Sequence, residues 1–149
     1  MSTADYHEDE GQRLAGERHA GIVTKDGMIL MMHRIKNGYE YYVFPGGHRR
    51  EGDAGEETVE REVYEETGIR AKVSKLAFEK TSNENTHTDY YYLCDWISGN
   101  QPALMGEEVI RNSKDNFFEP MWVKINQIES LNVLPEYSKE WILKDLAKE

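Results

Sequence analysis

The chain has 149 residues, a length that suits one domain with a single hydrophobic core. Its formal net charge of −10 disfavours a nucleic-acid polymer as partner, because such binding depends on lysine and arginine contacts to phosphate. One cysteine, Cys94, excludes an intrachain disulfide, and no apolar run reaches the roughly 18–20 residues that span a bilayer. Because no secretory signal pattern opens the sequence, we expect a cytoplasmic protein without a membrane partner.

The first part of the chain predicts a tail followed by strands. Residues 1–16 are polar, acidic and without periodicity, so we expect a mobile N-terminal tail before a single domain over residues 17–149. Turn signals at Lys25–Gly27 and Asn37–Gly38 separate apolar runs, and Pro45–Gly47 interrupts the pattern. Three strands are therefore predicted, over residues 19–24, 28–35 and 39–44.

A helix is predicted next, over residues 54–67, after a polar loop over residues 48–55. Val59, Val63 and Tyr64 would form its inward face, and Gly68 suits the position after its end. Two strands (residues 71–81 and 87–97), a long polar loop (99–116) and a last strand (117–125) should follow. A closing helix is expected to begin near Pro135 and to bury some of Tyr137, Trp141, Ile142, Leu143 and Leu146. The class is α/β or α+β with a mixed sheet.

The predicted helix crowds acidic residues in an unusual way. Six acids and one base, Arg61, lie between Glu56 and Glu66. Glu62, Glu65 and Glu66 are three and four residues apart, and like charges at that spacing cost a helix roughly 0.2–0.5 kcal/mol per pair. Carboxylate oxygens are ligands that Mg²⁺ prefers, so a cation among them would offset the repulsion. An acidic, solvated helix is the simpler alternative.

The surrounding sequence resembles the signature of the Nudix hydrolase family (MutT-like proteins), G-x5-E-x7-R-E-U-x-E-E-x-G-U, in which U is a bulky aliphatic residue. Residues 47–69 read GHRREGDAGEETVEREVYEETGI and match eight of the nine fixed positions. The ninth holds Asp53, where the family has glutamate. The flanking patterns YYVFPGG, FFEPMWVKI and LNVLPE also resemble the family's. The resemblance implies an α/β/α sandwich with a central mixed sheet.

The same resemblance implies a metal site and assigns roles to its residues. Glu66, Glu62 and Glu65 would bind Mg²⁺ or Mn²⁺, helped by the backbone carbonyl of Gly46 or Gly47. Glu62 would act as general base, and an acid from the later loop is the second choice. Arg61 would hold a carboxylate of the motif, and Asp53 would position the loop or a water molecule. The second-choice acids are Glu107, Glu108 and Glu119.

Basic residues near the motif are candidates for contacts to phosphate. His48, Arg49 and Arg50 follow the glycine pair, and Arg34 lies near the end of a predicted strand. A solvated loop and a surface ion pair are the alternative interpretations of these residues. Tyr39 and Tyr41 lie outside the motif, where a contribution to substrate specificity is expected.

The function implied is a metal-dependent pyrophosphohydrolase that cleaves a nucleoside diphosphate linked to another group, X. Candidate substrates are nucleoside triphosphates, oxidised triphosphates, ADP-ribose and nucleotide sugars, and the protein could form a homodimer, as many relatives do. One alternative is a non-catalytic, Nudix-fold module that binds nucleotides or regulates. Another is a hydrolase of non-nucleoside diphosphates, such as isoprenoid or inositol compounds.

Overall fold

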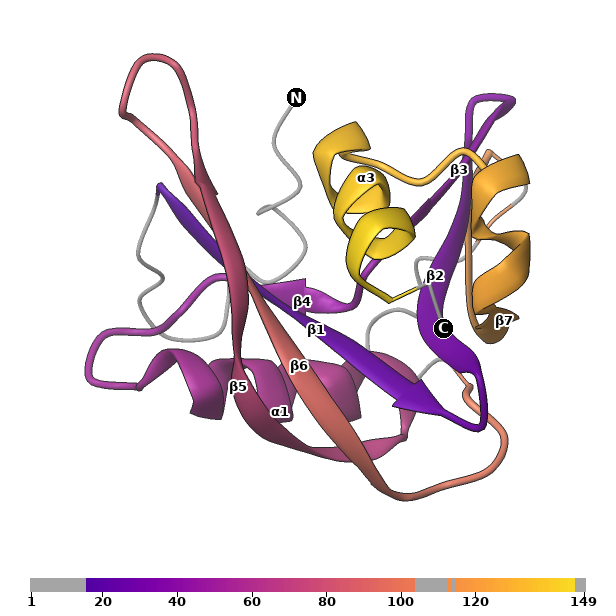
Figure 1. The fold of residues 1–149 in the computed structure, drawn as a ribbon, viewed down its shortest axis with the longest axis horizontal. Coiled ribbons are helices and arrows are strands. Elements are labelled where there is room, and N and C mark those ends of the chain that lie inside the picture. The colour runs from indigo at the N-terminus through magenta and orange to yellow at the C-terminus, as the bar shows by residue number, and fades with distance from the viewer. Residues whose placement is uncertain (1–15, 104–112, 114, 147–149) are drawn as a thin grey trace.

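The computed structural model describes residues 16–103, 113 and 115–146, which form a mixed sheet with helices on both sides (Figure 1). The expected N-terminal tail lies outside these residues except for Gly16. The strands are β1 (Glu17–Lys25), β2 (Met28–Lys36), β3 (Tyr39–Val43), β4 (Gly46–Gly47), β5 (Arg70–Thr81), β6 (Thr88–Ser98) and β7 (Asn116–Lys124). The helices are α1 (Gly55–Thr67), the 3-10 helix η2 (Ile125–Ser130) and α3 (Glu136–Asp145).

The sheet is mixed, as the sequence predicts. Its main order is β3-β2-β1-β6-β5, with β7 paired to β2 and the short β4 paired to β1. Strands β1 and β6 run parallel over eight residue pairs, and the other pairings are antiparallel. Strands β5 and β6 form a long antiparallel hairpin, and residues 82–87 are its connecting loop.

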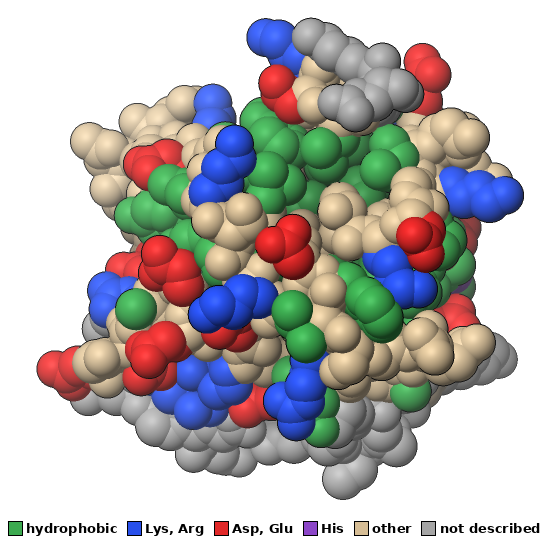
Figure 2. All heavy atoms as spheres, turned by 60° about the horizontal axis from the view of Figure 1, so that its bottom comes forward, with side chains coloured by type: hydrophobic (Ala, Val, Ile, Leu, Met, Phe, Trp, Pro, Cys, Tyr) green, Lys and Arg blue, Asp and Glu red, His purple; other side chains and the backbone are tan. Residues whose placement is uncertain are grey.

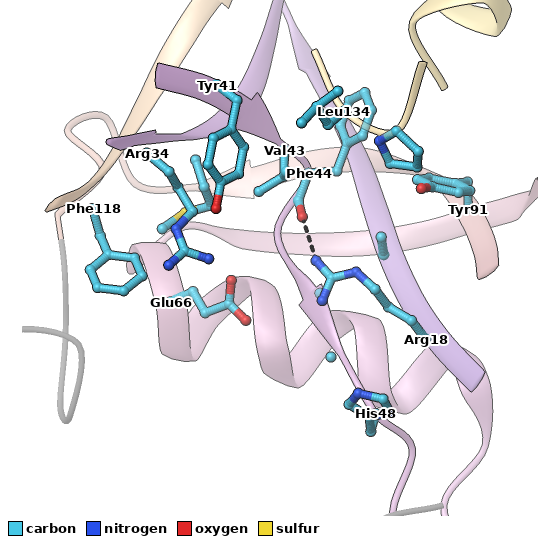
Figure 3. A pocket seen from close by; sticks show the side chains of 15 residues that line it. Arg18, Arg34, Tyr41, Val43, Phe44, His48, Glu66, Tyr91, Phe118 and Leu134 are labelled. Atoms are coloured by element: carbon cyan, nitrogen blue, oxygen red, sulfur yellow. Dashed lines mark hydrogen bonds between the residues drawn. The ribbon is translucent and has the colours of Figure 1, made fainter. Parts of the chain in front are cut away.

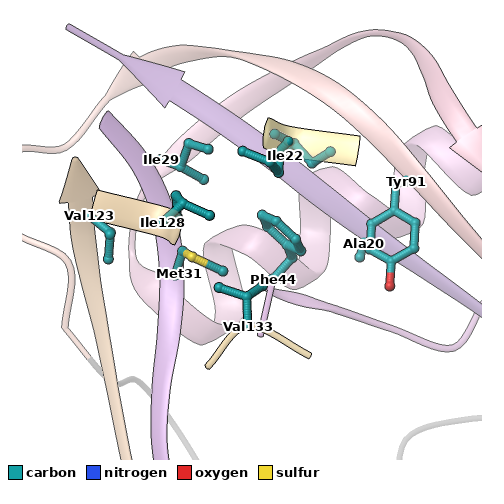
Figure 4. Close-up of a cluster of buried hydrophobic side chains, with 10 residues drawn as sticks. Ala20, Ile22, Ile29, Met31, Phe44, Tyr91, Val123, Ile128 and Val133 are labelled. Atoms are coloured by element: carbon teal, nitrogen blue, oxygen red, sulfur yellow. The ribbon is translucent and has the colours of Figure 1, made fainter. Parts of the chain in front are cut away.

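Each face of the sheet carries its own apolar cluster. Ala20 and Ile22 of β1 point to the face covered by η2 and α3, where Ile128 and Ile142 are fully buried (Figure 4). Val23 points to the opposite face, where it packs with residues of α1. This alternation follows from the pleat of a strand, which sends successive side chains to opposite sides. The layers are therefore α/β/α.

The sheet divides where β1 leaves β2. These two strands pair only at Thr24↔Ile29 and Lys25↔Met28. Beyond that point β1 pairs with β4 at His19 and Ala20, whereas β2 pairs with β3 from Met32 onward. Strand β7 pairs with one edge of β2 along its whole length. The other edge of β2 therefore pairs first with β1 and then with β3. The opening between the diverging strands positions the candidate site.

Several local predictions need correction. The Pro-Gly-Gly segment does not simply end a strand, because Gly46 and Gly47 pair with β1 as β4. The helix η2 was not predicted. The expectation that the closing helix buries some of its five apolar residues is confirmed, because Ile142 is fully buried and the other four are half-buried. Tyr64 is also half-buried, and the buried face of α1 includes Thr58 and Thr67 instead. No helix among the described residues is long and apolar enough to cross a membrane.

Candidate active site

The ends of α1 are fixed by local hydrogen bonds. At its start the Glu57 carboxylate accepts a hydrogen bond of 2.9 Å from the backbone N–H of Ala54. At its end Gly68 adopts φ 76°, and its N–H donates to the carbonyl of Tyr64 at 2.8 Å. Glycine adopts this left-handed conformation without steric cost. The last turn of the helix, which carries Glu65 and Glu66, is therefore held close to the start of β5.

Glu62 is fully buried against the backbone of β4. A Cβ built on Gly47 would lie 2.7 Å from the Cδ atom of Glu62, so only glycine allows this approach. Burying a carboxylate is costly unless it is paired or bonded, so this position needs a compensating partner. Arg61 is such a partner, with its Nη2 atom 3.4 Å from the Glu62 Oε2 atom.

Arg61 connects three of the acids in the motif. Its Nη1 atom lies 2.9 Å from the Asp53 Oδ2 atom, and its Nε atom lies 3.9 Å from the Glu65 Oε2 atom. With the bond to Glu62, one guanidinium serves carboxylates from the loop and from two positions of the helix. Two of these contacts are charge-assisted hydrogen bonds and the third, to Glu65, is an ion pair, and together they offset repulsion among the crowded acids. The shorter Asp53 side chain still reaches Arg61.

A cavity of about 160 Å³ lies beside this cluster, in the opening between β1 and β2. Figure 3 shows that its lining comes from both strands, from β4 and from the last turn of α1. The lining combines two arginines, a histidine and a glutamate with apolar and aromatic groups. It consists of Arg18, Ala20, Met32, Arg34, Tyr41, Val43, Phe44, Gly46, Gly47, His48, Glu66, Tyr91, Phe118, Leu134 and Pro135.

Two guanidinium groups face the cavity with Glu66 between them (Figure 3). Arg34 is buried, with its guanidinium carbon 4.2 Å from the Phe118 ring centroid, and its Nη2 atom donates to the Asn116 Oδ1 atom at 3.2 Å. Arg18 donates from its Nη2 atom to the Phe44 carbonyl at 2.9 Å. Aromatic stacking and hydrogen bonding fix both groups in place, so the cavity offers preoriented positive charge in an acidic protein.

The structure brings some predicted residues together and separates others. Arg34, His48, Gly46 and Glu66 line the cavity. Glu65 has a side chain that is 40% exposed and faces Arg61. Arg49, Arg50 and Glu119 do not line the cavity.

Arg49 forms an ion pair with Glu17, and Arg50 is half-buried in the loop after β4. Glu119 is exposed and pairs in register with His33, on the opposite face of β7 from the cavity residue Phe118. Glu107 and Glu108 lie outside the described residues. The roles assigned to all these side chains stay predictions.

The glycine backbone and the acids of α1 fit a hard divalent cation. Among the residues that the structure describes, no three Asp, Glu, His or Cys side chains are grouped so that they could hold a metal ion. Mg²⁺, however, usually takes one or two protein carboxylates and completes its shell with water and phosphate oxygens. Glu66 in the cavity, Glu62 against Gly47 and the bare backbone of β4 supply that kind of donor set.

Sequence reasoning missed two features of the cavity. Arg18 was not among the candidate site residues, although it lies two residues before Ala20 and shares its face of β1. Phe118 was expected only as part of a strand, and its contact with Arg34 depends on the pairing of β7 with β2. Strand alternation could have grouped Arg18 with Ala20, but the divergence of β1 from β2 left no signal in the local sequence.

Comparison with known proteins decides the family. The profile of the NUDIX domain matches residues 17–144, which is most of the chain. The chain belongs to the Nudix family. Among curated relatives, the ADP-ribose pyrophosphatase of Methanocaldococcus jannaschii is 42% identical over 57 residues, or 38% of this chain and 34% of that protein. A MutT-like protein of Streptomyces ambofaciens is 43% identical over 58 residues, or 38% and 36% of the two chains. Each alignment spans about a third of the relative's length.

Solved structures support the fold of this Nudix chain. The MutT structure from work on Aliivibrio salmonicida and Vibrio cholerae aligns with a TM-score of 0.65 at 21% identity, covering 89% of this chain and 97% of that one. At this identity the likeness establishes the fold alone. The central mixed sheet and few helices expected for the family are confirmed.

Proposed function

We propose that this Nudix protein is a divalent-metal-dependent pyrophosphohydrolase that cleaves a nucleoside diphosphate linked to X by attack of water on phosphorus. One observation carries the proposal, namely a cavity in which Glu66 and the glycine backbone of β4 meet the guanidinium groups of Arg18 and Arg34. A diphosphate needs both kinds of group, because its charge must be neutralised while its phosphorus is exposed to a nucleophile.

The acidic groups would hold the metal. When bound, Mg²⁺ or Mn²⁺ would lower the pKa of a water molecule and neutralise charge on the phosphate oxygens. Glu66 and the carbonyl of Gly46 would be its ligands on the cavity side, with Glu62 behind Gly47. Glu65 is the more distant choice of ligand, because it faces Arg61. Glu62 remains our choice of general base, and Arg61 fixes the orientation of its carboxylate.

The basic groups would orient the substrate. Arg34 is stacked on Phe118 and needs little reorganisation to donate to phosphate oxygens. Arg18 and His48 border the same cavity from β1 and from the loop after β4. Apolar side chains complete the lining and would contact the nucleoside or the group X, among them Val43, Phe44, Leu134 and Pro135. Tyr41 is the aromatic group best placed to influence substrate choice.

A substrate panel tests the proposal. The full chain is incubated with Mg²⁺ or Mn²⁺ and with nucleoside triphosphates, oxidised triphosphates, ADP-ribose, dinucleoside polyphosphates, NADH and nucleotide sugars. Products are identified by mass in ¹⁸O-labelled water. We expect metal-dependent release of a nucleoside phosphate, with one ¹⁸O atom incorporated into a phosphate group of the products. Binding without turnover across the panel would favour the non-catalytic, nucleotide-binding alternative.

A further inference from the structure

Arg49 is held on the side of the loop that faces the start of β1. Its Nε and Nη2 atoms donate to the Glu17 carboxylate at 2.9 and 3.3 Å, and its Nη1 atom donates to the Asp53 carbonyl at 3.0 Å. All three guanidinium nitrogens are thus engaged within the protein. This pairing holds the pKa of Glu17 well below its usual range, at about 2, so Glu17 stays ionised.

Glu17 is itself fixed by a buried histidine. The His19 Nε2 atom lies 2.6 Å from the Glu17 Oε1 atom, and the ionised carboxylate can only accept, so this nitrogen carries the proton. In the neutral ring the Nδ1 atom then accepts from the Tyr92 hydroxyl at 3.0 Å. Burial raises the pKa of Tyr92 to about 12, which keeps that hydroxyl protonated. Two neighbouring strands of the sheet therefore anchor the carboxylate that holds Arg49.

A continuous series of contacts leads from this anchor to the acids of the motif. Arg49 bonds the Asp53 carbonyl, and the Asp53 side chain bonds Arg61 at 2.9 Å. Arg61 in turn bonds the buried Glu62 at 3.4 Å. Glu17, Arg49, Asp53 and Arg61 do not line the cavity, so this series reaches the motif from outside the cavity.

We propose that Glu17 and Arg49 are positioning residues, which set the loop between β4 and α1 and thereby the orientation of the metal-binding carboxylates. The proposal rests on the proposed metal site, and it gives Arg49 a role other than phosphate contact. Groups that orient metal ligands from behind commonly change metal affinity or activity by about 10–100-fold when mutated. Because Glu17 acts on Glu62 through three intervening residues, we expect an effect near the lower end of that range.

The test measures Mn²⁺ binding by calorimetry and by electron paramagnetic resonance, without substrate, on the full chain. Glu17→Gln should weaken Mn²⁺ affinity about 10-fold, because it removes the charge that holds Arg49. Glu40→Gln is the matched control. Glu40 is also a strand glutamate bonded to a histidine, with its Oε2 atom 2.5 Å from the His33 Nε2 atom. The Mn²⁺ affinity of Glu40→Gln should stay within about twofold of the wild-type affinity.

Arg49→Lys separates the two roles of the arginine. A lysine keeps the charge but cannot bond Glu17 through two nitrogens and reach the Asp53 carbonyl as well. A positioning role predicts weaker Mn²⁺ affinity and a higher Mg²⁺ concentration for half-maximal activity, with the substrate KM unchanged. A raised substrate KM with unchanged Mn²⁺ affinity would instead make Arg49 a phosphate ligand and overturn the proposal.

The outcomes also distinguish this inference from the proposed function. Unchanged Mn²⁺ affinity in Glu17→Gln, in a protein whose wild type binds Mn²⁺ and hydrolyses substrate, overturns the positioning role alone. A wild type that neither binds Mn²⁺ nor hydrolyses any compound of the panel overturns the proposed function, and the positioning role with it. Thermal melting of each variant shows whether it is folded, and Glu17→Gln provides the milder change if Arg49→Lys does not fold.

Discussion

At the scale of single residues, the site depends on a close approach between a glycine and a carboxylate. Gly47 leaves room for the side chain of Glu62. Arg61, on the same helix, donates a hydrogen bond to the Glu62 carboxylate. The crowding of acids that is costly for an isolated helix becomes tolerable because Arg61 contacts Asp53, Glu62 and Glu65. The arrangement is typical of functional sites, where a local rule of stability is broken and compensated nearby.

Gly47→Ala should therefore reduce turnover without unfolding the protein. The new methyl group would lie 2.7 Å from the present position of the Glu62 Cδ atom, so that carboxylate must move. A displacement near 1 Å at a catalytic group can cost on the order of 100-fold in rate. Steady-state kinetics with Mg²⁺ measures the effect, and circular dichroism checks the fold. A folded variant with wild-type turnover would contradict the placement of Glu62.

At the residue scale, the resemblance to the family motif gave the expectation for Arg61. The motif predicted an arginine beside acids, and Arg61 does bond Asp53 and Glu62. Spacing could not predict that Glu62 is fully buried while the side chain of Glu65 is 40% exposed, because burial depends on what packs against each side of the helix. The pairing of Arg49 with Glu17 is also long-range, and nothing in the local sequence marks it.

At the scale of elements, the loop between β4 and α1 connects the sheet to the helix that carries the acids. Within this loop Arg49 donates a hydrogen bond to the Asp53 carbonyl. Arg49 also donates to the Glu17 carboxylate, which connects the loop to the start of β1. The helix itself could be predicted because its start, end and apolar period are local features. Strand β4 could not, because a two-residue strand is defined by its partner on β1 and not by its own sequence.

The Glu17–Arg49 pair should contribute to stability in a pH-dependent way. The pKa of Glu17 is about 2 in the folded protein, against 4.5 for the free side chain, mainly because of the hydrogen bond from Arg49. Its contribution is present above about pH 4.5 and is lost as the pH falls from 4.5 towards 2. Urea unfolding at pH 6 and pH 3 should show a larger stability difference between wild type and Glu17→Gln at pH 6. An equal difference at both pH values would contradict this assignment.

At the scale of the whole molecule, the divided sheet creates the cavity. Strands β1 and β2 separate after two residue pairs, and the opening is lined by the backbone of β4 and by side chains of α1 and of the segment before α3. The fold class and mixed sheet could be predicted from the order of elements. The parallel pairing of β1 with β6 and the divergence of β1 from β2 could not be predicted. Both depend on which strands, far apart in the sequence, pair with β1.

Charge at this scale agrees with a small anionic substrate. The net charge is −10, and on the face shown in Figure 2 acidic and basic side chains are interspersed. Arg18 and Arg34 lie together at the cavity in spite of this overall acidity. A diphosphate would therefore be attracted by local groups and by the cation, and not by the field of the whole protein.

The most direct test of the proposed function is the metal-dependent turnover of Glu66→Gln, compared with Glu140→Gln as a control on the exposed surface of α3. Glu66 is the acid of α1 that lines the cavity, and glutamine keeps its size while removing the charge that binds a cation. We predict that Glu66→Gln loses at least about 100-fold in kcat, or about 2.7 kcal/mol, with Glu140→Gln unchanged. Near-normal Mg²⁺-dependent turnover in Glu66→Gln would contradict the proposed site.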